Sequence, residues 1–241
     1  MTTVLVTGGA TGIGFALAER YLDAGAEVLI CGRRAEALDA ARVKRPALRT
    51  FVCDVAHRAQ REALVEWALE TSAGLDTLVN NAGIQRRVKL TEPEPWTSTE
   101  QELTVNLAAP IHLTQIVLPH LSKRPSATIV NVTSGLAFAP LAMVPIYCAT
   151  KAAMHSFTLS LRQQLAGTSV RVVELIPPAV DTDLGGPGLH KFGVPIAELA
   201  DATFARVLAG EPEVAYGFAQ QSSRASREEL DQIFARMNAP R

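Results

Sequence analysis

Short apolar runs alternate with longer segments of helical period along most of the chain. The runs are rich in aliphatic and β-branched residues, which favours strands, whereas apolar positions three and four apart favour helices. The predicted strands are residues 3–7, 27–31, 49–53, 77–80, 127–132, 170–176 and 213–216. The predicted helices are residues 14–24, 35–44, 58–71, 100–121 and 150–165.

The predicted strands are continuous apolar runs, such as AEVLIC and ATIVNV, rather than alternating ones. Such runs are typical of parallel strands that are covered on both faces. Repeated strand-then-helix order implies right-handed crossovers. The sequence therefore predicts an α/β fold with a doubly wound parallel sheet of about seven strands. No repeat, low-complexity stretch or linker divides the chain, so we expect a single domain over residues 1–241.

Composition narrows the classes of protein that fit. Hydrophobic residues make up 48% of the 241 residues and charged residues 20%, which is enough for a sizeable core. The net charge of −1 gives no general attraction to nucleic acid or to an anionic membrane. No apolar run reaches the roughly 18 residues that a membrane span needs, and the N-terminus lacks the pattern of a signal peptide. The three cysteines are widely spaced, so we expect free thiols and a cytoplasmic protein.

The first predicted strand leads into TGGATGIG, which contains Gly8, Gly12 and Gly14 and opens a helix. Glycines at this place allow a tight turn and a close approach of a pyrophosphate to the helix N-terminus. The spacing is G-x-x-x-G-x-G, and no Lys–Ser/Thr pair follows, which argues against a P-loop. The pattern favours dinucleotide binding.

The second predicted strand ends in ICGRRAEAL, where an acidic residue would bind the adenosine ribose of NAD(H). Here Gly32 takes that place, and Arg33 and Arg34 follow it. Two arginines at a helix start oppose the helix dipole, which a phosphate partner would explain. The alternative is a solvated charged face. We predict NADP(H), with NAD(H) as the other possibility.

The segment PIYCATKAAMHSF places Tyr147 and Lys151 four positions apart, on one face of a predicted helix. A structural interpretation has the tyrosine packed inward and the lysine extended to water. In the functional interpretation, the ammonium lowers the pKa of the phenol, which then exchanges a proton near neutral pH.

The motifs together resemble those of a short-chain dehydrogenase/reductase over nearly the whole chain. They comprise TGGATGIG, CDV after the third strand, NNAG after the fourth, Asn106 in TVNLAAP, Ser134, and the Tyr147–Lys151 pair thirteen positions after Ser134. The segments GRR, NNAGIQRR and ASREELDQIFARMN further resemble the oxidoreductase branch that is associated with D-alanylation operons. The resemblance implies a Rossmann-type sheet, with a cofactor-binding half at 1–125 and a catalytic half at 126–241.

The resemblance also implies a role for each matching residue. Tyr147 exchanges a proton with a carbonyl or alcohol oxygen, Lys151 holds the nicotinamide ribose, and Ser134 bonds the reacting oxygen. Asn106 binds a water in a proton relay. The implied cofactor-binding residues are Gly8, Thr11, Gly12, Ile13, Gly14, Arg33, Arg34, Asp54, Val55, Asn81, Ala82, Gly83, Tyr147, Lys151, Pro177, Val180 and Thr182. Pro178 departs from the Pro-Gly of the family, so we expect a locally altered loop.

Several weaker signals leave alternatives open. Arg86 and Arg87 favour an anionic substrate if they face it, and the apolar GLAFAPLAMVPIY is typical of a hydrophobic pocket or of ordinary packing. His155, one turn after Lys151, is assigned a structural role. The histidines form no metal spacing, and VTSGL is not the elbow of a serine hydrolase. A cofactor-binding sensor without turnover is the rival class, and a nucleic-acid accessory protein is disfavoured by the charge.

The resemblance implies a homodimer or homotetramer, built on the helices predicted at 100–121 and 150–165. At the C-terminus, Ser226 and Glu229 have the spacing of a capping box. The helix that follows places Leu230, Ile233, Phe234 and Met237 on one stripe. We expect this stripe to cover the chain's own domain or a neighbouring subunit.

Overall fold

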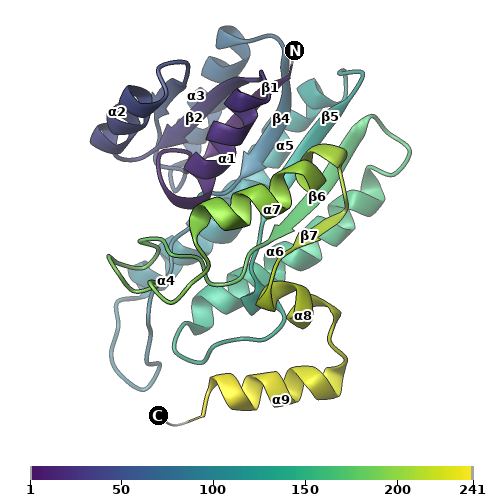
Figure 1. Cartoon of the computed structure of the whole chain (residues 1–241). Coiled ribbons are helices and arrows are strands. Elements are labelled where there is room, and N and C mark those ends of the chain that lie inside the picture. The colour runs from purple at the N-terminus through teal and green to yellow at the C-terminus, as the bar shows by residue number, and fades with distance from the viewer. Residues whose placement is uncertain (1, 240–241) are drawn as a thin grey trace.

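The computed structural model describes residues 2–239, which form a seven-stranded sheet with helices on both faces (Figure 1). All neighbouring strands are parallel, and their order is β3-β2-β1-β4-β5-β6-β7. The strands are β1 (Thr3–Thr7), β2 (Glu27–Gly32), β3 (Arg49–Val52), β4 (Leu75–Asn80), β5 (Ala127–Val132), β6 (Val170–Ile176) and β7 (Glu213–Ala215). The prediction of a doubly wound parallel α/β fold is confirmed.

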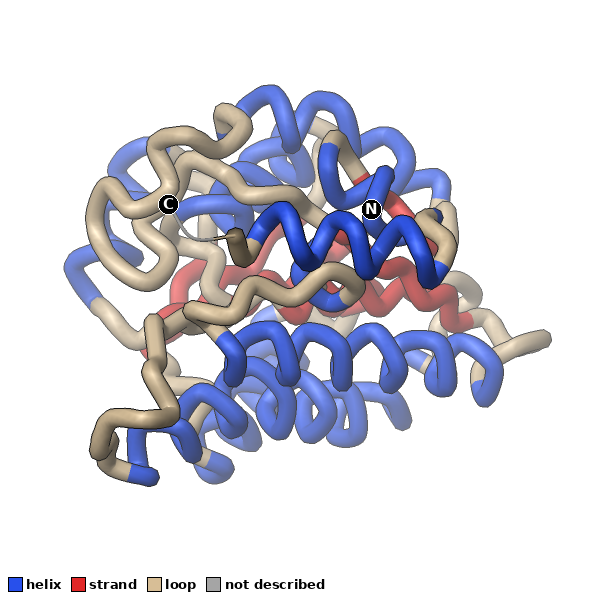
Figure 2. Tube along the Cα trace, turned by 90° about the horizontal axis from the view of Figure 1, so that it is seen from below, coloured by secondary structure: helices blue, strands red, loops and turns tan. Residues whose placement is uncertain are grey.

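Helices cover the sheet in two layers, as the view from below shows (Figure 2). The helical segments are α1 (Gly12–Asp23), α2 (Ala35–Lys44), α3 (Arg58–Thr71), α4 (Trp96–Leu103), η1 (Thr104–Ala108), α5 (Ala109–Leu121), η2 (Gly135–Ala137), α6 (Pro145–Gln164), α7 (Ile196–Ala209), α8 (Phe218–Arg224) and α9 (Arg227–Met237). One apolar core joins the sheet to α3, α5 and α6, and the other joins it to α1, α2 and α7.

The two cores explain the continuous apolar strands. Successive side chains of a strand point to opposite faces, so Val4 and Val6 of β1 enter one core and Leu5 enters the other. All three have no exposed surface. Burying each such side chain contributes roughly 1.5–3 kcal/mol, so both faces of the central strands stabilise the fold.

Two predicted helices have different bounds in the structure. The helix predicted at 100–121 begins at Trp96 and is interrupted by η1, a five-residue π-helical turn. The helix predicted at 150–165 begins at Pro145, where a proline suits the first turn because it lacks an N–H. The helices α7 and α8 were not predicted.

Within residues 2–239, no helix combines the length and the apolar character that a bilayer crossing requires.

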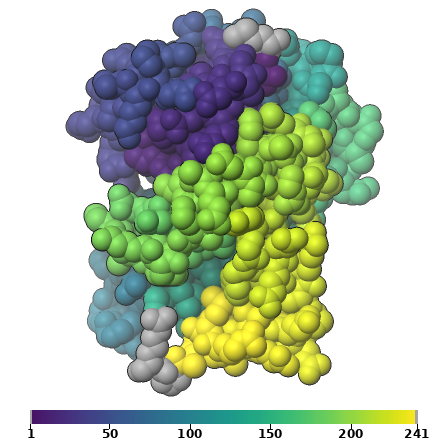
Figure 3. All heavy atoms as spheres, in the orientation of Figure 1, coloured from purple at the N-terminus to yellow at the C-terminus, as the bar shows by residue number. Residues whose placement is uncertain are grey.

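The C-terminal helix α9 begins with the predicted capping box. The Glu229 amide donates to the Ser226 hydroxyl at 3.3 Å, and the Glu229 carboxylate accepts from the Ser226 amide at 2.6 Å. Beyond the helix, the Asn238 side chain accepts from the Ala142 amide at 2.6 Å and donates to the Pro140 carbonyl at 3.1 Å. The helix therefore lies against the chain's own loop before α6, at the lower edge of the molecule in Figure 3.

A pair of substitutions tests this docking of α9. Ile233 is 3% exposed and Phe234 is 43% exposed. We expect Ile233→Ala to lower the free energy of unfolding in urea by about 2 kcal/mol, because it removes buried methyl groups and leaves a cavity. Phe234→Ala is the control and should cost clearly less. An equal fall in the free energy of unfolding in the two variants would contradict the docking of α9 through Ile233.

Candidate active site

The candidate site lies at the carboxyl edge of the parallel sheet. The glycine turn follows β1, the Asn81–Gly83 segment follows β4, Ser134 follows β5, and Pro177 follows β6. Strand β1 has β2 on one side and β4 on the other. The order in which the chain adds strands to the sheet therefore reverses at β1. Ligands of open parallel sheets bind at such a switch point.

The glycine turn requires its glycines for two physical reasons. Gly8 and Gly12 have φ values of +63° and +57°, a region that side chains disfavour. At Gly14, a Cβ atom would lie 2.4 Å from the Gly8 carbonyl oxygen and 2.3 Å from the Asn81 Nδ2 atom. The start of α1 therefore packs directly against the turn and against the end of β4.

Hydrogen bonds lock this turn to the segment after β4. The Asn81 side chain donates to the Thr7 carbonyl at 2.9 Å and to the Gly8 carbonyl at 3.2 Å. In return, the Thr7 hydroxyl accepts from the amides of Asn81 and Ala82 at 3.0 and 3.1 Å. Two loops that are far apart in sequence are thereby held as one surface.

The start of α1 suits an anion. Thr11, at its N-cap, makes no side-chain capping bond, and the first turn contains no acidic residue. The helix N-terminus therefore keeps amides and a partial positive charge that a capping carboxylate would otherwise use. A pyrophosphate fits this place, with Gly8, Gly12 and Ile13 around it.

At the end of β2, Arg33 and Arg34 are exposed. Neither forms a salt bridge with an acid among residues 2–239, although the nearby Arg42, Arg45 and Arg49 do. On the neighbouring loop, Asp54 accepts from the Ala56 amide at 2.9 Å, and Val55 is buried beside it. Two free guanidinium groups at this edge are available to a phosphate.

Helix α6 places Tyr147 and Lys151 one turn apart, as predicted, and both are buried. The Lys151 ammonium donates to the Val132 carbonyl at the end of β5 at 2.8 Å. Its Nζ atom lies 5.6 Å from the centre of the Tyr147 ring. The structural interpretation, in which the lysine extends to water, is therefore wrong.

Burial dominates the proton affinities of these two groups. Desolvation raises the pKa of Tyr147 well above its usual value, and a hydrogen bond with Ser134 opposes this rise. Desolvation lowers the pKa of Lys151 to about 8, and the Glu174 carboxylate opposes this fall. The expected lowering of the tyrosine pKa by the ammonium is not what the protein groups produce, because low dielectric disfavours both charged forms.

Asn106 is held rigidly in the π-helical turn η1. Its side chain donates to the Ile84 carbonyl and accepts from the Ile84 amide, both at 2.8 Å, and donates to the Thr150 hydroxyl at 3.3 Å. A Cβ atom on Gly83 would lie 3.4 Å from Asn106 Oδ1 and 3.9 Å from Lys151 Nζ. The structure thus brings Asn106, Gly83 and Lys151 together. A π turn is a frequent feature of functional sites because it redirects a side chain.

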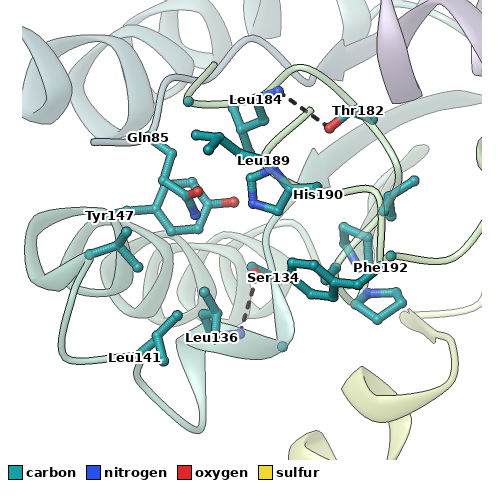
Figure 4. A pocket seen from close by; sticks show the side chains of 18 of the residues that line it. Gln85, Ser134, Leu136, Leu141, Tyr147, Thr182, Leu184, Leu189, His190 and Phe192 are labelled. Carbon is teal, nitrogen blue, oxygen red and sulfur yellow. Dashed lines mark hydrogen bonds between the residues drawn. The ribbon is translucent and has the colours of Figure 1, made fainter. Parts of the chain in front are cut away.

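A cavity of about 500 Å³ opens beside Tyr147 and Ser134 (Figure 4). Figure 4 shows the Tyr147 ring, Gln85 amide and His190 imidazole directed towards the same space. Most of the wall is apolar and includes Leu136, Leu141, Val144, Leu184, Leu189 and Phe192. The predicted residues Ile13, Pro177, Val180 and Thr182 also line it, so the cavity reaches from α6 to the glycine turn.

The loop after β6 folds back along this cavity. Val180 pairs with Val194 in an isolated bridge, with bonds of 2.9 Å from Asp181 to Val194 and from Val194 to Ala179. A Cβ atom on Gly193 would lie 2.6 Å from the Val180 backbone, so only glycine permits the approach. Pro178, the expected departure from the family, is part of the cavity wall.

Three features of the cavity were missed from sequence or were only partly predicted. Arg87 lines it, whereas the Arg86 guanidinium donates to the Ser98 carbonyl and to Gln101 Oε1, so the arginine pair divides. His190 lies in the loop between β6 and α7, in which the sequence showed no motif. Met237 of α9 reaches the cavity from the C-terminus.

No group of three or more potential metal ligands occurs within residues 2–239.

Comparison with known proteins identifies the family of the chain. The model of the short chain dehydrogenase family matches residues 2–190. The chain belongs to the short-chain dehydrogenase family. It is 45% identical over 242 residues to the uncharacterized oxidoreductase DltE of Bacillus subtilis, and the match covers 98% of this chain and 96% of that protein.

Solved short-chain dehydrogenases have the same fold. A short-chain dehydrogenase from Sphingobium yanoikuyae in complex with NADPH matches with a TM-score of 0.82 at 26% identity, covering 96% of both chains. A 3-ketoacyl-(acyl-carrier-protein) reductase from Brucella melitensis complexed with NADH matches with a TM-score of 0.79 at 27% identity, covering 89% of this chain and 96% of that one. The protein is an oxidoreductase of the short-chain dehydrogenase family.

Glu102 is an unusual side chain for the core of this dehydrogenase. It lies in α4, one turn before Asn106, and is 1% exposed. Neither carboxylate oxygen has a hydrogen-bond partner within residues 2–239. Burial raises the pKa of Glu102 to about 7, and the backbone amide and charge of Arg86 oppose the rise. The carboxyl therefore favours its protonated form inside the fold.

This raised pKa predicts a pH-dependent stability. Because the folded state holds the Glu102 proton more tightly, the stabilisation is complete below about pH 4.5 and is lost as the pH rises through about 7. Between pH 5 and 8, the free energy of unfolding of Glu102→Gln should gain about 2–3 kcal/mol relative to the parent protein. Urea denaturation at both pH values measures this change. A constant difference between the two proteins would contradict it.

Proposed function

We propose that the protein interconverts a carbonyl compound and a secondary alcohol with NADP(H) as cofactor. The observation that carries the proposal is the position of the Ser134 and Tyr147 hydroxyls on the wall of an apolar cavity, with Lys151 buried behind them. The same cavity reaches the glycine turn through Ile13. When bound, the nicotinamide supplies the hydride chemistry.

The protein's own residues orient the substrate and move its proton. The Ser134 hydroxyl accepts from the Leu136 amide at 3.1 Å, which leaves its hydrogen for an acceptor in the cavity, the Tyr147 oxygen or the reacting oxygen. The Tyr147 hydroxyl donates its proton to that oxygen in reduction and accepts it in oxidation. The Lys151 ammonium, which donates to the Val132 carbonyl at 2.8 Å, binds the ribose of the cofactor. Asn106 fixes the backbone beside Lys151 through its two bonds to Ile84.

The walls of the cavity favour a substrate with an apolar body. Leu141, Leu184, Leu189 and Phe192 offer no partner for polar groups, whereas Gln85, His190 and Arg87 each offer one. Arg87 is exposed, so an anionic group at the cavity mouth meets a charge that remains accessible to water. We therefore expect bulky apolar ketones to react faster than small polar ones.

The rival function is a sensor that binds the cofactor without turnover. The buried position of both Tyr147 and Lys151 disfavours it, because a sensor has no use for a desolvated proton donor and cation. Incubation of the purified protein with NADPH and a panel of apolar carbonyl compounds separates the two functions. Loss of absorbance of the reduced nicotinamide supports the enzyme, and binding without any turnover supports the sensor.

Assembly belongs to the proposal as well. We propose a homodimer or homotetramer that pairs through α4–α5 and α6. On α6, Leu159 is 41% exposed, which favours an apolar contact there.

Tyr147→Phe tests the assigned mechanism. The substitution removes the proton donor and retains the ring, so carbonyl reduction should fall about 10²–10⁴-fold while NADPH affinity changes little. Tyr216→Phe is a matched control, because the Tyr216 hydroxyl donates to Glu198 in a solvent-exposed hydrogen bond and does not line the cavity. Steady-state kinetics and fluorescence titration measure both quantities. Turnover close to that of the parent in Tyr147→Phe would refute the role of the phenol.

Arg33→Ala tests the cofactor preference. The parent should bind NADPH more tightly than NADH, and Arg33→Ala should reduce that preference by about tenfold, the effect of one charge-assisted hydrogen bond. Arg42→Ala is the control, since Arg42 is an exposed arginine of α2 that already pairs with Asp39. Equal affinities of the parent for the two cofactors would mean that Arg33 and Arg34 are only solvated charge.

A further inference from the structure

The buried face of α6 continues beyond the proposed catalytic pair. His155 follows Lys151 by one turn, as Lys151 follows Tyr147, so the three side chains form a row along one face of the helix. The edge of the His155 ring packs against Phe138, with 4.6 Å between ring centres. The His155 side chain is 23% exposed, so the row runs from the buried Tyr147 to a group that can exchange protons with water.

The row ends on Glu174 of β6, whose side chain has no exposed surface. His155 Nδ1 lies 2.9 and 3.1 Å from the two carboxylate oxygens of Glu174. The Thr133 hydroxyl donates to the same carboxylate at 2.7 Å. A fully buried acid is unusual in a parallel strand, and this one is satisfied from two different elements.

Glu174 is connected to the Lys151 site through β5. Thr133 directly precedes Ser134, and its amide donates to the Leu175 carbonyl at 2.9 Å. Val132, whose carbonyl accepts from the Lys151 ammonium, pairs with Leu175 in the sheet. One buried carboxylate thus lies next to the strand end that carries both the acceptor of Lys151 and the proposed catalytic Ser134.

We propose that Glu174 is a positioning residue: its buried carboxylate fixes Thr133 beside Ser134 and places a negative charge beside the strand end that binds Lys151, and His155 modulates that charge. The consequence for turnover rests on the proposed function, but the effect on Lys151 does not. Lys151 has to leave water without losing its proton, and a nearby negative charge offsets the cost of that desolvation.

The surrounding charges are consistent with this assignment. Hydrogen bonding to Glu174 raises the pKa of His155 above its usual 6.5, and the charge of Glu213 acts in the same direction. Arg162 of α6 acts in the opposite direction, and its guanidinium donates to the Val172 and Pro212 carbonyls at 3.1 and 2.6 Å. Near Lys151 itself, the carboxylate of Glu174 opposes the loss of the proton.

The charge on His155 changes how strongly the Glu174 carboxylate stabilises the protonated form of Lys151. While the imidazole is protonated, it neutralises much of the field that Glu174 exerts on Lys151. As the pH rises and His155 loses its proton, the His155–Glu174 pair becomes net negative and holds the Lys151 proton more firmly. Lys151 is active as the cation, so its function is lost as the pH rises through its own pKa. The His155–Glu174 pair therefore extends the pH range in which Lys151 is protonated, and so active, towards higher pH.

Direct titration of Lys151 tests the proposal without any substrate. The full chain is labelled with ¹³C at lysine Cε, and the Lys151 resonance is identified by its absence from Lys151→Arg. We expect Glu174→Gln to lower the pKa of Lys151 by about one unit, the change that loss of a close charge produces. In His155→Gln the pKa should stay or rise, because the carboxylate loses its neutralising partner. Thr133→Val keeps the charge and should shift the pKa less than Glu174→Gln does.

If Glu174 and His155 only pack against their neighbours, the pKa of Lys151 should not shift in opposite directions in Glu174→Gln and His155→Gln. An unchanged pKa of Lys151 in Glu174→Gln, or an equal fall in Glu174→Gln and His155→Gln, would overturn the proposal. If Glu174→Gln does not fold, His155→Gln still decides, since a lowered pKa there contradicts the assignment. In an active enzyme, the basic limb of the kcat profile should move with the Lys151 pKa. A parent without turnover would refute the proposed function and leave the titration as it stands.

Discussion

The burial of one polar face of α6 against the ends of β5 and β6 is the constraint on which the candidate site depends. This packing takes a phenol and an ammonium out of water and offers them only a few fixed partners. The Val132 carbonyl accepts from Lys151, and Ser134 lies on the same cavity wall as Tyr147. Low dielectric then makes each remaining charge effective over several ångströms, which is why one carboxylate on β6 influences the lysine.

The sheet supplies the geometry that this packing needs. Because all seven strands are parallel, their carboxyl ends meet at one edge, where β1, β4, β5 and β6 end around the catalytic candidates and β2 ends at Arg33 and Arg34. The bonds between Asn81 and the glycine turn join β1 to β4, and the bond of Thr133 to Glu174 joins β5 to β6. The π-helical turn η1 brings Asn106 beside Gly83 and Lys151. Substrate and cofactor regions are therefore parts of one continuous surface rather than separate sites.

Most of the fold and the grouping of the site could be predicted from the sequence. Continuous apolar runs identified every strand within two residues, because both faces of each strand are buried. The order of motifs along the chain brought Ser134, Tyr147 and Lys151 to one edge, since parallel strands leave no other arrangement. The capping box at Ser226 was local in sequence and was therefore predicted correctly.

Other features depend on contacts that no local pattern records. The π turn arises where Asn106 bonds the backbone of Ile84, which is distant in sequence. The raised pKa of Tyr147 reflects desolvation, whereas the sequence argument weighed only the neighbouring cation. Glu174 could have been noticed as an acid inside an apolar run, but its partner His155 lies on another element. The walls of the cavity come from loops and from α9, which packing alone brings together.

We propose that hydride passes from the nicotinamide to a carbonyl carbon in this cavity while Tyr147 supplies the proton. Incubation of the parent protein with NADPH that carries two deuterium atoms at the nicotinamide C4 position, together with apolar ketones, measures this transfer. We expect an alcohol product with deuterium on the former carbonyl carbon, formed by the parent and not by Tyr147→Phe. Tight binding of NADPH with no labelled alcohol from any member of the panel would contradict it.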